Sequence, residues 1–195
     1  HREFQNVEWS FRPLSETVRL CIILAGAGIL LVVAATVGIY GVLDVDKFWI
    51  KLYVVILLLA MGVISLFHSR RERPYRPNFL VLFGAVAGFN KGVGGGGYGP
   101  VVTMGGMLAG VPVKSMLGVT ALAEGFVCLA AVIAWLAMTI QGVGVDYVLL
   151  PSVMLASMFS AVGAPYLTRV FPEKLWRVVV PAYCLVVVVI TVWNM

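Results

Sequence analysis

The sequence predicts an all-α, polytopic helical membrane protein with a Gly-rich broken (re-entrant) helix. Of its 195 residues, 61% are hydrophobic and only 12% are charged, a composition typical of chains that lie in lipid. Long apolar runs alternate with short polar segments, and several approach the roughly 20 residues that a membrane-spanning helix needs. One apolar region is interrupted by a cluster of glycines at residues 92–99.

Five apolar runs are expected to span the bilayer as helices. They are residues 20–43, 48–67, 114–140, 147–167 and 178–193. The last helix is expected to begin near Glu173, because Pro172 just before it suits a helix start. The loops 68–78 and 169–177 carry most of the arginines, so the positive-inside bias predicts that both are cytoplasmic.

The region 79–113 is predicted to enter the membrane and return as a hairpin. Its apolar halves, 79–89 and 101–113, are each too short to span, and six glycines with Pro100 prevent a helix between them. The hairpin keeps every cationic loop on one side, whereas a single crossing at this point would separate them. We expect the break within residues 90–100, and transporters place binding sites at such broken helices.

A weak internal repeat predicts inverted repeats within a single membrane domain. An acidic–Lys–apolar–Trp motif begins at Asp46 and again at Glu173, each time at the second helix of a pair. The pairs 20–67 and 147–193 would then be two copies that run in opposite senses; chance similarity between apolar helices is the alternative. Residues 1–78 would be the end of a first half with its cytoplasmic linker, and residues 79–195 a second half.

The run Gly-Ala-Val-Ala-Gly-Phe-Asn-Lys-Gly-Val-Gly-Gly-Gly-Gly-Tyr-Gly-Pro at 84–100, with Gly118-Val119-Thr120 downstream, resembles the sulfite exporter TauE/SafE family. The resemblance implies a transporter that exports small anions, sulfite or organosulfonate-type sulfur oxyanions, in the bacterial inner membrane. It also implies that this chain lacks the N-terminal part of the first half. Lys91 and Glu124 depart from the general family pattern and point to a subgroup with its own substrate.

The residues around the break are the candidate substrate site. Glycine N–H groups can form an anion-binding nest, a helix that starts near Val101 adds a positive dipole end, and Lys91 adds a full charge. Alternatively, the glycines only allow close helix packing. Asn90 and Tyr98 could donate to the ligand or satisfy freed backbone groups. The substrate-binding candidates are Asn90, Lys91, Gly92, Gly94, Gly95, Gly96, Gly97, Tyr98 and Thr120.

Glu124 is the candidate coupling or ion-pair residue. It lies four residues after Thr120, so the two side chains share a helix face, near mid-membrane. Glu124 could relay protons, or it could be a static partner of Lys91.

Other functional classes find little support in the sequence. There is no Gly-Lys-Ser/Thr, His-Glu-x-x-His or Gly-x-Ser-x-Gly motif, so we expect no enzyme, no cofactor and no metal. The net charge of +5 follows from cationic loops and does not indicate nucleic-acid binding. The expected partners are a small anion and the lipid bilayer, with protons as a candidate coupling ion and a homo-oligomer left open. The alternative function is a non-transporting integral-membrane scaffold or subunit, which would need no charge inside the membrane.

Overall fold

The computed structural model describes residues 15–43, 45–68, 76–94, 97–144, 148 and 150–193. All secondary structure in these ranges is helical, which confirms the predicted all-α class. The elements are α1 (Glu16–Thr36), the π-helix η2 (Val37–Leu43), α2 (Lys47–His68), α3 (Pro77–Gly94), α4 (Tyr98–Leu108), α5 (Val113–Ile140), α6 (Leu150–Val170) and α7 (Glu173–Trp193).

Four segments of the described chain are long and apolar enough to cross a membrane. They are Thr17–Leu43, Phe48–Phe67, Val113–Ile140 and Glu173–Trp193. The fifth predicted span is present as the helix α6, which has 21 residues and carries one charged side chain, Arg169. The described residues therefore form a helical integral membrane protein.

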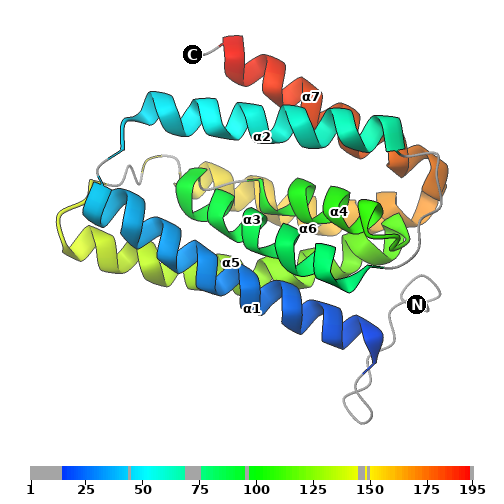
Figure 1. Ribbon diagram of the computed structural model, residues 1–195, viewed down its shortest axis with the longest axis horizontal. Helices are drawn as coiled ribbons and strands as arrows, with labels where there is room; N and C mark the ends of the chain where they lie inside the picture. The colour runs from blue at the N-terminus through cyan, green and yellow to red at the C-terminus, as the bar shows by residue number, and fades with distance from the viewer. Residues whose placement is uncertain are drawn as a thin grey trace.

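The broken region lies at the centre of the bundle. In Figure 1, α3 and α4 run between α2 and α7 on one side and α1 and α5 on the other. α1 packs against α3 and α5, α4 packs against α3 and α5, and α2 packs along α7. The α6 helix is exposed along nearly its whole length. α1, α2, α5 and α7 thus surround the hairpin that the glycines interrupt.

The helix break falls within the predicted range but is shorter than expected. α3 continues through Asn90 and Lys91 to Gly94, and α4 already begins at Tyr98. Gly97 precedes α4 with a φ of 81°, a left-handed conformation that favours glycine. Pro100 lies in the first turn of α4, where its missing N–H is not needed. The predicted break between residues 90 and 100 is therefore confirmed; Gly95 and Gly96 lie outside the described residues.

The hairpin returns to the level at which it began, because the start of α3 lies beside the end of α4. The Arg76 N–H, just before α3, donates to the carbonyl of Ala109, just after α4, at 3.0 Å. α4 has 11 residues and is therefore about 16 Å long, roughly half of the hydrocarbon thickness. α3 has 18 residues and is about 27 Å long, so this arm is longer than the half-span that the sequence predicted, and only α4 has the predicted length of a re-entrant arm.

Glycines allow α3 to approach α1 closely. Gly84, Gly88 and Gly92 recur every four residues, so they lie along one face of α3. A methyl group at Gly88 would lie 2.5 Å from the carbonyl oxygen of Gly28 on α1. One at Gly92 would lie 2.6 Å from the Val32 carbonyl oxygen. Such contact between small residues is a main source of helix association in lipid.

The predicted inverted repeat stays a prediction. The packing of α2 along α7 brings together the second helices of the two proposed pairs. Residues 69–75, which hold most of the cationic side chains of the loop between the two proposed halves, lie outside the described residues.

We expect Gly88→Ala to lower the free energy of unfolding by about 1–3 kcal/mol, because the added methyl group forces α3 away from α1. Unfolding in mixed micelles, followed by circular dichroism, measures this change. Gly26→Ala on α1 is the matched control, since nothing lies within 4 Å of the added methyl group. Equal stability of the two variants would contradict the close crossing of α1 and α3.

Candidate functional site

The carbonyl groups at the end of α3 find hydrogen-bond donors on the first span. The Thr36 hydroxyl bonds to the Val32 carbonyl at 2.8 Å and reaches the Gly92 carbonyl at 3.4 Å. The Tyr40 hydroxyl, on η2, donates to the Val93 carbonyl. A carbonyl without a partner is costly in lipid, because no water is present to replace the lost bond. Thr36 and Tyr40 therefore stabilise the open backbone.

A buried ion pair lies beside the break. Lys91, in the last turn of α3, is only 8% exposed, and its Nζ atom lies 3.0 Å from Oε1 of Glu124 on α5. The Glu124 side chain is more open, at 31% exposure. The ammonium lies at the carbonyl end of α3, where the helix dipole favours positive charge. The structure therefore brings together the two ionisable residues that the sequence singled out.

The second oxygen of Glu124 lies against the first turn of α4. A methyl group on Gly99 would lie 3.0 Å from Glu124 Oε2, so a side chain here would require the carboxylate to move slightly away from α4. The N-terminal end of a helix carries a partial positive charge of about half an elementary charge. The carboxylate is thus held between the Lys91 ammonium and the positive end of α4, a position suited to an anion.

Two cavities border the break in the part of the chain that the structure describes, and the larger of them adjoins this carboxylate. It has a volume of about 430 Å³ and lies between α4, α5 and α7. Its lining residues are Gly99, Pro100, Thr103, Leu117, Thr120, Ala121, Glu124, Trp176, Val179, Val180 and Tyr183. Thr120 and Glu124 are the two members of the predicted site that line it.

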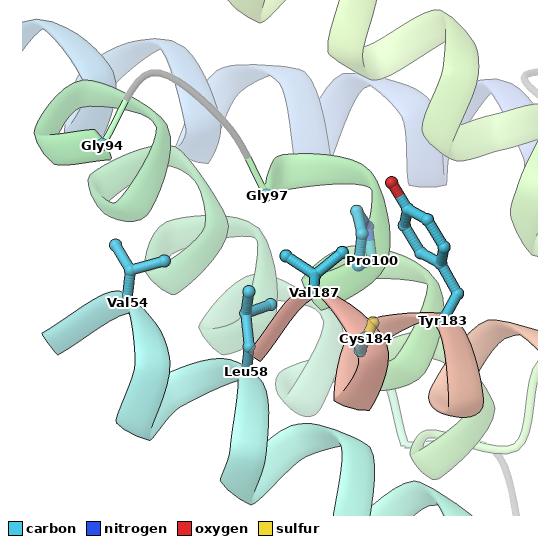
Figure 2. Close-up of a pocket in the computed structure, with 8 residues that line it drawn as sticks. All are labelled: Val54, Leu58, Gly94, Gly97, Pro100, Tyr183, Cys184 and Val187. Atoms are coloured by element: carbon cyan, nitrogen blue, oxygen red, sulfur yellow. The ribbon is translucent and has the colours of Figure 1, made fainter. Parts of the chain in front are cut away.

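The smaller cavity lies at the break itself. It has a volume of about 200 Å³, and Figure 2 shows Gly94 and Gly97 on the two sides of the interrupted backbone. The opposite wall is formed by apolar side chains of α2 and α7. These are Val54, Leu58, Cys184 and Val187. Pro100 and Tyr183 line both cavities, so the two spaces adjoin at these residues.

Three of the other predicted residues, Asn90, Gly92 and Tyr98, pack against neighbouring groups at the break. Asn90 is fully buried. A methyl group added to Gly97 would lie 2.5 Å from the Asn90 Nδ2 atom, so the Asn90 amide occupies the space beside this glycine. The Tyr98 hydroxyl donates to the carbonyl of Leu24 on α1 at 2.9 Å. Gly92 faces α1, as the packing alternative expected. Gly94 and Gly97 line the smaller cavity and Thr120 and Glu124 the larger one, whereas Lys91, like Asn90, Gly92 and Tyr98, lines neither of the two. The roles of all these residues in binding stay predictions.

Three residues with clear roles in this geometry were absent from the sequence-based candidates. Thr36 and Tyr40 support the break through hydrogen bonds to α3. The sequence feature that could have indicated them is a pair of polar residues, four apart, within an apolar run. Trp176 lines the larger cavity, although the sequence marked it only as part of the repeat. Trp49, the tryptophan of the first acidic–Lys–apolar–Trp motif, is 62% exposed. The motif alone therefore could not indicate which tryptophan faces the cavity.

A helical membrane bundle around a broken re-entrant helix, with a buried ion pair and cavities at the break, defines a membrane transporter. A family model described as Sulfite exporter TauE/SafE matches residues 12–191, nearly the whole chain. The chain belongs to this family of transporters, as the glycine motif indicated. No curated protein and no solved structure matches it.

We expect Tyr40→Phe to lower the free energy of unfolding by about 1–3 kcal/mol, because it removes a donor from the Val93 carbonyl. Reversible unfolding in mixed micelles measures the loss. Tyr53→Phe is the matched control, since its ring packs edge-on against Phe89 at 5.8 Å and the change retains that contact. If Tyr40→Phe is as stable as the wild type, η2 does not support the break.

Proposed function

We propose that this protein exports small sulfur oxyanions, of the sulfite or organosulfonate kind, across the bacterial inner membrane. Membership of the sulfite exporter TauE/SafE family supports this substrate class. The observation that carries the proposal is the position of the Glu124 carboxylate, between the Lys91 ammonium and the first turn of α4. The protein's own carboxylate would occupy the place that a transported anion takes.

Substrate binding would be an exchange of one anion for another at Lys91. In a low-dielectric site the attraction between Lys91 and any anion is much stronger than in water. An arriving anion must also recover the hydrogen bonds that it loses with water. The ammonium and the N–H groups at the start of α4 are the donors that can do so. Glu124, the more exposed partner, is the group that moves aside.

Displacement of Glu124 provides a reason for coupling to protons. A carboxylate that loses its ammonium partner inside the membrane is costly while it stays charged, and taking up a proton removes that cost. The anion and the proton would then move together. In a static ion pair, by contrast, Glu124 would never leave Lys91 and no proton would accompany the substrate.

We expect Lys91→Met to reduce sulfite flux at least about tenfold, because the variant loses a charged hydrogen-bond donor to the anion. Proteoliposomes loaded with radiolabelled sulfite measure the flux. Lys51→Met, which removes an equal charge from an exposed position on α2, is the control and should transport normally. A non-transporting scaffold would show no flux in the wild type, and unchanged flux in Lys91→Met would refute the role of Lys91.

We expect Glu124→Gln to separate anion movement from proton movement. The amide still packs beside Lys91 but cannot exchange a proton, so anion flux should persist while the accompanying pH change disappears. A pH-sensitive dye inside the proteoliposomes records the protons, and labelled sulfite records the anion. If the wild type moves sulfite without protons, Glu124 is only a static partner of Lys91.

A further inference from the structure

The wall of the larger cavity is almost entirely hydrocarbon. Leu117 and Ala121 line it from α5, and Val180 lines it from α7. The carboxylate in the wall, that of Glu124, is already held by the Lys91 ammonium. Atoms that line an empty apolar space lose dispersion contacts on that side, so a volume of about 430 Å³ favours an apolar occupant.

The cavity extends along two helices toward the middle of the bundle. On α5 it runs from Leu117 to Glu124, about 10 Å along the helix axis. On α7 it covers the same length, from Trp176 to Tyr183. Val179 and Tyr183 are 41% and 60% exposed, so the cavity is open at the surface of the bundle. Both helices are long and apolar enough to span the membrane, so the apolar molecule that meets this opening is lipid, and an acyl chain has the shape to enter.

Cationic side chains gather at the end of the bundle where the cavity begins. The Nζ atom of Lys114 donates to the Arg169 carbonyl at 3.5 Å, so the start of α5 lies beside the end of α6. α7 follows α6 after two residues and brings Lys174 and Arg177 to the same place, and Figure 1 shows this turn at one end of the bundle. Glu173 pairs with Arg177 at 3.0 Å. These four cations and one carboxylate, which we call the cationic corner, keep a net positive charge.

The cationic corner and the apolar cavity are continuous. Lys114 precedes Leu117 by three residues, so the two side chains share one face of α5. Arg177 precedes Val180 by three residues and shares a face of α7 with it. Basic pockets between membrane helices bind the head groups of anionic lipids. The charge of the corner therefore selects an anionic phospholipid over a zwitterionic one.

We propose that an anionic phospholipid, such as phosphatidylglycerol, binds at this position. Its phosphodiester lies at the cationic corner, and one of its acyl chains fills the larger cavity as far as Glu124. The chain keeps water away from this side of the ion pair, which strengthens the attraction between Lys91 and an anion. This inference goes beyond the proposed export function and does not depend on it.

Native mass spectrometry of the protein released from nanodiscs tests the head-group preference. The nanodiscs contain equal parts of phosphatidylglycerol and phosphatidylcholine with the same acyl chains, and we expect the wild type to retain phosphatidylglycerol. Lys114→Gln and Lys174→Gln should each weaken this retention about fivefold, the effect of removing one cation near a lipid head group. Lys51→Gln is the control, because it removes an equal charge from an exposed position near the start of α2.

The same measurement on cavity variants tests where the acyl chain lies. Ala121→Leu fills the cavity and keeps every cation of the corner, so it should also weaken the retention of phosphatidylglycerol. Gly125→Leu is the matched control on α5, since nothing lies within 4 Å of a side chain added there. It should retain phosphatidylglycerol as the wild type does.

Fluorescence quenching locates the chain without any change to the cavity walls. Phosphatidylglycerol with brominated acyl chains, added in small amounts to phosphatidylcholine bilayers, should quench Trp176 in a saturable way. Trp176→Phe should lose this saturable quenching. Trp49→Phe should keep it, because Trp49 is 62% exposed and lies outside the cavity.

Several results would overturn the proposal. Equal retention of the two lipids by the wild type, or unchanged retention in both lysine variants, would show that the cationic corner selects no head group. Unchanged retention in Ala121→Leu, or quenching that is not saturable, would show that no chain enters the cavity. A dimer that appears in place of bound lipid would assign this surface to a second copy of the chain. Since none of these measurements requires transport, a failure of the export function leaves the lipid site standing.

Discussion

The fold depends on satisfying the backbone of a broken helix where no water is available. The ends of α3 and α4 expose peptide groups in the middle of the bundle, and an unsatisfied group there would cost several kcal/mol. α1 and η2 meet part of this need through Thr36 and Tyr40, which donate to the last carbonyls of α3. They can reach those carbonyls only because the helices cross at Gly28 and Gly88 with almost no space between their backbones. The small residues and the polar residues of the first span therefore act together.

The same break creates the electrostatic environment of the site. One helix ends and another begins within four residues, so a negative and a positive dipole end lie close together. Lys91 lies at the first and Glu124 at the second, which makes each charge complementary to the backbone beside it. A buried ion pair alone contributes little stability, because desolvation offsets its attraction. The two helix ends help to compensate for that desolvation, and the glycine at position 99 lets the carboxylate come close.

Simple physical signals in the sequence predicted the helices, the break and the two charges. Apolar length marks spans, consecutive glycines cannot hold a helix, and an ionisable residue inside an apolar run is rare enough to indicate function. The sequence could not predict which way each side chain points. Gly92 faces α1 while Gly97 borders a cavity, and this difference depends on how α3 and α4 rotate when they pack. Trp49 and Trp176 share a motif but not an environment, because α7 packs beside the hairpin and leaves a cavity there.

The neutrality of the Lys91–Glu124 pair has an electrical consequence. The energy of a single charge changes by about 2.3 kcal/mol for every 100 mV of membrane potential that it crosses. The energy of a neutral pair changes by almost nothing. If a singly charged anion, such as hydrogensulfite or a sulfonate, replaces the carboxylate and the carboxylate takes up a proton, the loaded site is neutral as well. Neither state would then respond strongly to the membrane voltage. Such a site would work at the same rate in an energised and a depolarised cell, driven by the gradients of the anion and of pH.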